Sequence, residues 1–560
     1  MREWAPFNNG RAAATVVAIL AVLIAASTLG NGFTLDDVPI IATNARVHSL
    51  ASIGSLFSQT YWPPSEGASL YRPLTMVWFT LQWAVGGGSP LVFHVVSVLL
   101  YAAACVSFYL LAAEVIPIAA AFVAAAFFAV HPVHVEVFAN VVGQPELWVA
   151  IIALLATRHY VRRRRAGAYS GGDSAKLVAA FFVACLFKEN AIILPALFLA
   201  AELTLVRQPL HERIKSLAPF FFLLLVAGAT FVFLRTGVIG RFAGAGQNGL
   251  LSISSFDVRL WTTLSIVLEW VRLLMWPAVL SADYSYRRLD VSPSFEPLML
   301  MSVFIIIAAI AIAIRVRRRH EGFAFGTAWM FVSLVLPSNL LIVTGFMLAE
   351  RALFLASAGF IICVAAAGAY LWKLASQRDE RMRQALAALC IVLLGAAALR
   401  SVTRGPVWKD NGTLLRQTVN DVPLSYRAHW MLAEHLLKDG PNPNGLDEML
   451  VAVGLARKND SYVLAFAADR FREAGKCGPA LGMYHKALGL RPEASDVRIG
   501  AAACLVTQGR IREAQNVALE GLKMRKPEPI LSSIVAYTDS VLRSRDRGLP
   551  APAPAVLPGN

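Results

Sequence analysis

Apolar residues are grouped in blocks of about 17–22 residues, each long enough for an α-helix to cross a bilayer core of about 30 Å. Short polar turns separate these blocks until about residue 402, where the blocks stop. A long outer loop, 31–90, follows the first block, and its stretch 73–85 is apolar on one side, which predicts a helix along the membrane surface. The pattern predicts eleven spanning helices, over 12–29, 92–114, 117–131, 146–160, 174–187, 190–206, 217–235, 296–314, 323–337, 352–373 and 384–400.

Basic residues between the blocks predict the topology, because Lys and Arg are enriched in cytoplasmic turns. The loop 131–145 has neither residue and is expected outside. Segment 257–279 is apolar but carries charges, and counting it as a span would put the run 315–319 outside, so we expect it to be interfacial or re-entrant. The N-terminus is then inside and the C-terminus outside. The runs are Arg162–Arg165, Arg207 with Arg213 and Lys215, Arg315 with Arg317–Arg319, and Lys373 with Arg378, Arg381 and Arg383.

A different pattern begins after the last block. Within 426–546, small residues recur every 34 positions, at Ala433, Ala467 and Ala501, at Gly475 and Gly509, and at Ala480 and Ala514. This period indicates about three tetratricopeptide repeats, each a pair of helices. The expected organisation is a membrane domain over 1–402, a connector over 403–425, the repeat domain over 426–546 and a disordered Pro/Ala-rich tail over 547–560.

Composition and charge agree with a protein of the lipid bilayer. Hydrophobic residues make up 57% of the chain and charged residues 16%. The net charge of +15 comes from short runs between apolar blocks, so we exclude nucleic acid as a partner. Four cysteines lie in apolar blocks, whereas Cys477 and Cys504 lie in the polar domain, where a disulfide and two free thiols both remain open.

Two adjacent acids, Asp36 and Asp37, follow the first span on the outer side. Close carboxylates raise one pKa and permit base catalysis. A solvated loop or a helix cap is the alternative. Their apolar neighbours favour a buried functional pair.

His131, His134 and Glu136 follow the third span. Two histidines and a glutamate suggest a metal site, but no further outer His or Cys completes one. We therefore expect no metal and no cofactor, and hydrogen bonding or substrate orientation by these residues instead.

Several other charges lie at span boundaries on the outer side, where basic residues run against the usual bias. Such charges often only anchor helices by snorkelling. Arginine, however, holds a phosphate in a bidentate fork, so a lipid-phosphate substrate would explain these positions. The residues are Lys188, Glu189, Asp283, Arg287, Arg288, Glu350 and Arg351.

These segments together resemble the transmembrane and tetratricopeptide-repeat-containing O-mannosyltransferases and their bacterial relatives, within the type-C glycosyltransferase superfamily. The resemblance covers nearly the whole chain in the same order. One departure is Glu146, which Gln144 and Pro145 precede where the family usually has Arg or Lys, and another is the shorter repeat array. The resemblance rests on Leu35–Ile41, Ser69–Leu74, Phe93–His94, Phe128–Glu136, Asn140–Gly143, Phe187–Asn190, Asp283–Ser285 and Ala349–Leu355.

The resemblance implies an all-α fold of the type-C glycosyltransferase kind and an inverting, metal-independent transfer on the outer or lumenal face. The donor would be a sugar, mannose or a similar hexose, on polyprenyl or dolichyl phosphate, and the acceptor a protein hydroxyl or a glycan. Asp36 would be the base and Asp37 its support. The donor would be bound by residues among Arg72, His131, His134, Glu136, Lys188, Glu189, Arg287, Glu350 and Arg351.

Two other functions are considered beside the enzyme: a non-catalytic scaffold whose repeats recruit a protein partner, and a transporter of lipid-linked sugars. A transporter is expected to carry ionisable residues near the bilayer midplane. Here the charges gather at one face, which favours one-sided chemistry. The expected location is the bacterial inner membrane with periplasmic repeats, or the endoplasmic reticulum with lumenal repeats in a eukaryote.

Overall fold

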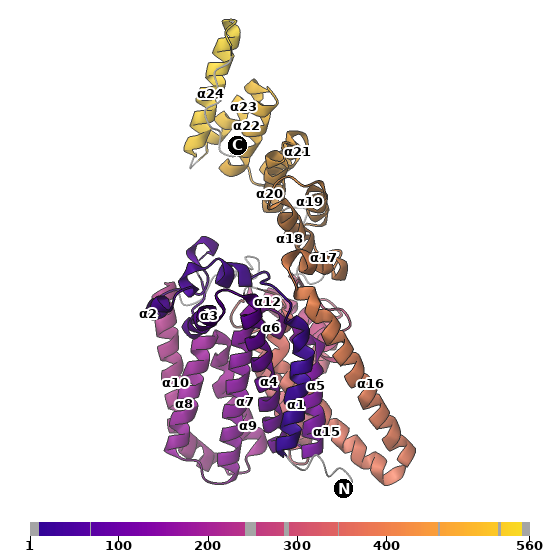
Figure 1. Ribbon diagram of the computed structural model, residues 1–560. Helices are drawn as coiled ribbons and strands as arrows, with labels where there is room; N and C mark the ends of the chain where they lie inside the picture. The colour runs from indigo at the N-terminus through magenta and orange to yellow at the C-terminus, as the bar shows by residue number, and fades with distance from the viewer. Residues whose placement is uncertain are drawn as a thin grey trace. The chain divides into compact units, whose positions relative to one another are not determined.

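The structure, a computed structural model, describes residues 10–67, 69–240, 254–284, 291–344, 346–456, 460–524 and 528–550. Every regular element in these ranges is helical. The described residues up to Leu414 form a first unit, and those from Leu415 form a second (Figure 1). Arg287, Arg288 and the last ten residues of the tail lie outside the described residues.

Eleven helices of the first unit lie over the eleven predicted spans, and those labelled α1, α4, α5, α7, α8, α9 and α10 run side by side in Figure 1. Among the described residues, seven helical stretches are long and apolar enough to cross a membrane, or eight if α5 and its continuation Pro132–Ala139, bent by 51°, form one broken span. The predicted fold class, a helical membrane domain followed by a repeat solenoid, is confirmed, while the number of spans stays a prediction. The helices are α1 Gly10–Ala25, α4 Pro90–Val115, α5 Ile118–Val130, α7 Gln144–Arg165, α8 Gly171–Phe187, α9 Leu194–Leu205, α10 Leu210–Ile239, α13 Met299–Val316, α14 Glu321–Leu334, α15 Phe354–Arg378 and α16 Glu380–Arg404.

Shorter helices occupy the segments between these spans. The first loop includes a π-helix over Val38–Ala42 that follows the acid pair, and α3 at the position expected for a surface helix. The segment expected to be interfacial is α12, whose charged residues exclude it from the seven apolar stretches. The bounds are α2 Ile53–Leu56, α3 Pro73–Gly86, α6 Val135–Ala139, α12 Phe256–Met275 and α17 Asn411–Asp421.

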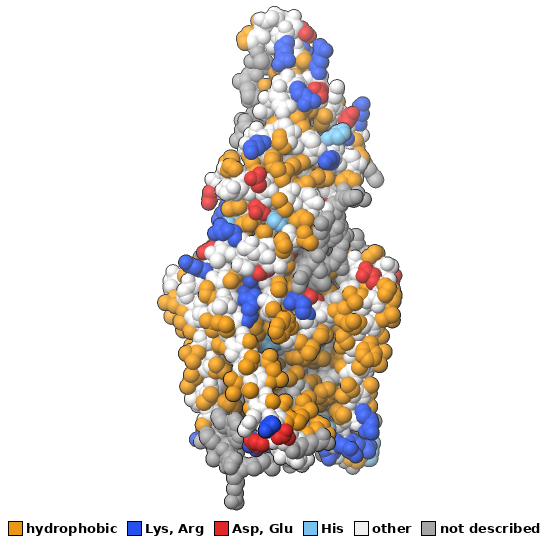
Figure 2. Space-filling model, turned by 90° about the vertical axis from the view of Figure 1, so that its right-hand side faces the viewer, with side chains coloured by type: hydrophobic (Ala, Val, Ile, Leu, Met, Phe, Trp, Pro, Cys, Tyr) orange, Lys and Arg blue, Asp and Glu red, His pale blue; other side chains and the backbone are white. Residues whose placement is uncertain are grey.

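Small residues allow close packing inside the first unit, and apolar residues cover its outside. A Cβ on Gly326 of α14 would lie 2.6 Å from the carbonyl oxygen of Gly359 on α15, so only glycine permits this backbone contact. Only 6% of the apolar window of α16 is buried. Figure 2 shows hydrophobic side chains over most of the visible middle of this unit, with Lys and Arg side chains at its lower edge. This surface fits a hydrocarbon environment.

The arginine run that ends α7 pairs with acids from four different helices. Each arginine therefore fastens α7 to another helix, in addition to the topological role predicted for the run. The innermost pair, Arg164 with Glu202, is almost completely buried, and the phenol of Tyr160 donates to the same carboxylate at 2.8 Å. The pairs are Arg162 with Glu114 of α4 at 3.6 Å, Arg163 with Asp173 of α8 at 3.1 Å, Arg164 with Glu202 of α9 at 2.8 Å, and Arg165 with Glu321 of α14.

Replacing Arg164 by alanine is expected to destabilise the first unit by up to about 3–5 kcal/mol, because it removes the two-pronged partner of the buried Glu202 carboxylate and leaves it only the phenol of Tyr160 and Arg213 at 3.7 Å. Arg162→Ala is the matched control, since the Arg162 side chain is 57% exposed and surface pairs contribute only about 0–1 kcal/mol. Unfolding of the purified protein in detergent measures both changes. Equal losses of stability in the two variants would contradict this prediction.

The second unit contains the predicted helix pairs. The repeating alanines are buried where the two helices of a pair touch. Gly475 and Gly509 each lie in the turn between the two helices of one pair. Their φ angles are +72° and +74°, a conformation that favours glycine. The helices are α18 Tyr426–Leu437, α19 Pro443–Leu455, α20 Ser461–Glu473, α21 Cys477–Leu490, α22 Ser495–Thr507, α23 Ile511–Leu522 and α24 Pro529–Asp546.

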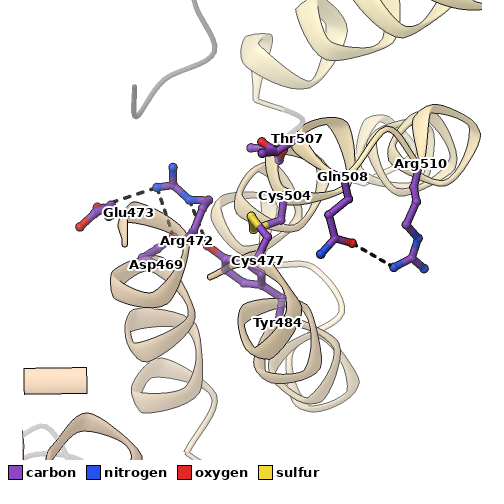
Figure 3. Close-up of a disulfide and its surroundings, with 10 residues drawn as sticks. Asp469, Arg472, Glu473, Cys477, Tyr484, Cys504, Thr507, Gln508 and Arg510 are labelled. Carbon is purple, nitrogen blue, oxygen red and sulfur yellow. Dashed lines mark hydrogen bonds and ion pairs between the residues drawn. A yellow bond between two sulfur atoms is a disulfide. The ribbon is translucent and has the colours of Figure 1, made fainter. Parts of the chain in front are cut away.

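Cys477 and Cys504 form a disulfide between α21 and α22, which belong to neighbouring repeats (Figure 3). Their Cα atoms are 5.2 Å apart, within the range that a disulfide requires. Beside it, the buried phenol of Tyr484 donates to Asp469 at 2.6 Å and accepts from Arg472 at 3.3 Å. The disulfide alternative left open by the sequence is therefore the one that the structure contains.

Candidate active site

Asp37 anchors the loop that follows the first span. Its buried carboxylate accepts backbone N–H bonds from Val142 at 2.8 Å, Thr34 at 3.2 Å and Val141 at 3.3 Å. Burial raises the pKa of Asp37 to about 7, although the three N–H donors act in the opposite direction. The side chain thus joins the first outer loop to the segment 140–143, and its bonds are all to backbone.

Asp36 points elsewhere, because successive side chains diverge. It is half-buried, and its carboxylate makes no hydrogen bond or ion pair with any residue that the structure describes. It lies within electrostatic range of Arg351. Of the two acids, Asp36 is the one whose carboxylate is available to a substrate.

Three ion pairs surround this loop, and each joins segments far apart in the sequence. Arg72 donates to Glu189 from Nε at 2.8 Å and from Nη2 at 2.5 Å. Lys188 pairs with Glu146, which also accepts from Asn190 at 2.7 Å. The third pair is Arg351 with Glu136, whose carboxylate also accepts the backbone N–H of Arg351 at 2.9 Å. Five of the predicted donor-site charges are therefore held by buried or half-buried partners.

The three pairs influence one another electrostatically. Burial lowers the pKa of Lys188, against the charge of Glu146, and Arg72 and Arg351 are close enough to act on the same ammonium. Burial opposes ionisation of Glu189, but the charge and hydrogen bonds of Arg72 outweigh it and lower the pKa of Glu189 to about 2. The pairs therefore form one charged cluster, and the charge of Asp36 acts on its Arg351.

The two arginines of the cluster differ in which of their guanidinium nitrogens make hydrogen bonds. Arg72 uses Nε and Nη2 on Glu189, lies over the ring of buried Tyr61 at 4.8 Å, and has a side chain only 10% exposed. Arg351 uses Nη1 and its backbone N–H on Glu136, and its side chain is 23% exposed. Its guanidinium lies over the ring of Phe346 at 5.5 Å, but Nε and Nη2 have no hydrogen-bond partner among the described residues, so Arg351 is better placed than Arg72 to bind an anion.

His131, His134 and Glu350 make their contacts outside this cluster. Nε2 of His131 lies 3.1 Å from the carbonyl of Leu274. The ring of His134 lies between Ser357, at 2.8 Å from Nε2, and Tyr101, at 3.2 Å from Nδ1. These contacts join α5 and its continuation to neighbouring helices, which is a packing role.

Glu350 accepts the backbone N–H of Ser281 and the phenol of Tyr284, both at 2.6 Å. It therefore fixes the segment after α12, although it is adjacent to Arg351 in sequence. No group of three or more His, Cys, Asp or Glu side chains in the described ranges is arranged to hold a metal ion.

Sequence reasoning missed Glu146 and Tyr61 as members of the site. Glu146 appeared only as a departure from a family pattern, although an acid at the outer end of a span was a usable signal, because such charges are costly there. Tyr61 gave no signal, since an aromatic residue in a long loop is common. Its position under Arg72 depends on the folding of residues 31–90.

Several curated proteins are similar to this chain. A protein O-mannosyl-transferase of Caenorhabditis elegans is 26% identical over 434 residues, covering 75% of this chain and 59% of that protein. Protein O-mannosyl-transferase TMTC4 of Mus musculus is 25% identical over 486 residues, covering 76% and 64%. Protein O-mannosyl-transferase Tmtc2 of Drosophila melanogaster is 31% identical over 47% of this chain and 29% of that protein.

The matches leave a large part of these relatives uncovered, because the chain spans about three fifths of the length of the first two. No family model matches the chain. Among solved structures, yeast Tom70 aligns with 72% of this chain and 92% of its own at 12% identity, with a TM-score of 0.20 that carries no argument.

Proposed function

We propose that the chain is a member of the transmembrane and tetratricopeptide-repeat O-mannosyl-transferase family and that it is a membrane glycosyltransferase. The donor is a hexose, mannose or a close relative, on polyprenyl or dolichyl phosphate. The acceptor is a hydroxyl of a protein or glycan at the outer face of the membrane. The observation that supports this proposal best is the Asp36 carboxylate, which has no hydrogen bond or ion pair among the described residues and acts electrostatically on Arg351, itself clustered with the buried cations Lys188 and Arg72.

In the proposed reaction, the acceptor oxygen attacks the anomeric carbon while Asp36 takes its proton. A new C–O bond forms on one side of that carbon, and the bond to the phosphate oxygen breaks on the other, so the configuration inverts. The leaving lipid phosphate gains one negative charge. Arg351, supported by Lys188 and Arg72, stabilises that charge, since cations held in place by Glu136, Glu146 and Glu189 need little reorganisation.

We propose further that the outer loop and the repeats lie outside the cytoplasm, in the periplasm of a bacterium or the lumen of the endoplasmic reticulum. The Arg162–Arg165 run supports a cytoplasmic position for the ends of the spans that lie away from the outer loop. The Cys477–Cys504 disulfide supports an oxidising compartment for the repeats.

Alkaline phosphatase fused after residue 545 is expected to be active, because that enzyme requires an oxidising compartment. An inactive phosphatase together with an active cytoplasmic reporter at the same point would contradict the topology.

A transfer assay tests the proposed function. Purified full-length protein is incubated with radiolabelled polyprenyl-phosphate sugars and an extract of envelope proteins, and label is expected in protein or glycan. The repeats are expected to bind this acceptor or another protein partner, because solenoids present extended binding surfaces. Movement of labelled lipid across a liposome bilayer without transfer would indicate a transporter. The absence of both transfer and lipid movement would favour a scaffold.

A further inference from the structure

The loop that carries Asp36 is also held by the segment that follows the last membrane helix. The backbone N–H of Leu35 donates to Oδ1 of Asn411 at 2.7 Å, across 376 positions of sequence. The N–H of Gly32 donates to the carbonyl of Lys409 at 2.8 Å. The side-chain amide of Asn31 donates to the carbonyl of Gly405 at 3.1 Å. Three successive bonds therefore align residues 31–35 along residues 405–411.

Glycines on both sides allow this close approach. A Cβ on Gly32 would lie 3.3 Å from the carbonyl oxygen of Lys409, and a Cβ on Gly405 would lie 2.3 Å from Oγ of Ser27. The backbone of Gly32 thus packs directly on the backbone of Lys409. Residues 405–411 hold the loop on one side, and the bonds of Asp37 hold it on the other.

Leu35 is the residue at which this contact affects Asp36. Its φ is +44°, in the left-handed region that a leucine rarely adopts. Such a conformation persists only where surrounding contacts impose it. The Asn411 side chain accepts the hydrogen bond from the Leu35 amide. The turn at Leu35 then sets the direction of the next side chain, Asp36.

The side chain of Asn411 is available for this bond because another residue caps its helix. Asp410 accepts the backbone N–H of Thr413 at 2.7 Å, which is the capping bond at the start of α17. Asn411 is the first residue of α17, and the same helix continues to Asp421, through the boundary between the two units.

We infer that Asn411 is a positioning residue for Asp36, so that the connector to the repeats, and not the membrane domain alone, completes the geometry of the base. This inference rests on the proposed function of Asp36. A displaced base slows the chemical step and leaves donor binding intact. The connector residue should therefore affect kcat and not the KM for the donor.

Three full-length variants test this inference. Asn411→Ala removes the acceptor for Leu35, and Asn411→Asp retains an oxygen in the same place. Gln417→Ala is the control on α17, because the side chain of Gln417 donates to Asp421 of the same helix, at 2.8 Å. We measure kcat, the KM for a polyprenyl-phosphate mannose donor, and the hydrogen-exchange rate of the Leu35 amide. Asn411→Ala should lower kcat at least tenfold, leave KM within twofold and accelerate exchange at Leu35. Asn411→Asp should recover most of kcat, and Gln417→Ala should resemble the natural protein.

Faster exchange at Leu35 with an unchanged kcat would overturn the inference, because the loop would then be held without consequence for the base. An equal loss of kcat in Gln417→Ala would also overturn it, in favour of a general dependence on α17. Absence of transfer by the natural protein would instead contradict the proposed function, and the exchange rates would then decide alone whether Asn411 holds the loop.

Discussion

Asp36→Asn should lower the rate of transfer about a hundredfold or more, the usual contribution of a general base, while donor binding persists. The amide retains the shape of the carboxylate but does not accept the proton. Because the Asp36 side chain has no hydrogen bond or ion pair among the described residues, the substitution removes no contact on which folding depends. Thermal unfolding of the variant should therefore match that of the natural protein.

Asp37→Asn is the matched comparison, and its expected defect is of another kind. An amide has one oxygen in place of two, so at least one of the N–H groups of Thr34, Val141 and Val142 loses its acceptor. We expect lower stability, by about 1–3 kcal/mol, together with lower activity. Near-normal turnover by Asp36→Asn with an inactive but stable Asp37→Asn would assign the base to Asp37. Normal turnover by both single variants and the double variant would end the assignment of either acid.

Arg351→Ala should be nearly inactive, and Arg351→Lys should bind the donor about tenfold to hundredfold more weakly. The lysine retains the charge but lacks the planar fork that binds phosphate through two N–H groups. A charge-assisted hydrogen bond contributes about 1.5–3 kcal/mol, and each 1.4 kcal/mol is a factor of about ten in affinity. Donor affinity is measured by titration of a polyprenyl-phosphate sugar in detergent.

Arg351→Ala also leaves Glu136 buried without its partner, so misfolding must be separated from loss of the donor contact. The double variant Arg351→Ala/Glu136→Gln removes the stranded charge and should restore stability without restoring donor affinity. Arg272→Ala on α12 is a second control, since that arginine pairs within its own helix with Glu269 at 2.6 Å. Donor affinity equal to that of the natural protein in Arg351→Ala would return Arg351 to a purely anchoring role.

Local patterns in the sequence predicted the fold well, because each depends on nearby residues. A continuous apolar block indicates a membrane helix independently of the rest of the chain. In the same way, each 34-residue period among Ala433, Ala467 and Ala501 indicates one helix pair. The count of spans was harder to predict, because α9 and α14 are short and α5 bends sharply into Pro132–Ala139.

The partners within the site could not be predicted, since they depend on contacts between distant segments. Arg351 lies 215 positions from Glu136, and Leu35 lies 376 positions from Asn411. Spacing in the sequence drew attention to His131 and His134, which bond to packing partners instead. The charge signal was more informative, because Lys188 and Arg351 could only be accommodated at span boundaries with partners.

The arginine run at the end of α7 has a consequence for how the chain is made. Only Glu114 precedes the run, whereas Asp173, Glu202 and Glu321 follow it, the last by 156 positions after Arg165. When the ribosome has just completed α7, the acidic partners of three of the four arginines have therefore not yet been synthesised. During membrane insertion these uncompensated charges orient the helix by the proposed topology. As later helices arrive, their acids neutralise the run one arginine at a time, so the same four residues first direct insertion and then hold the assembled bundle together.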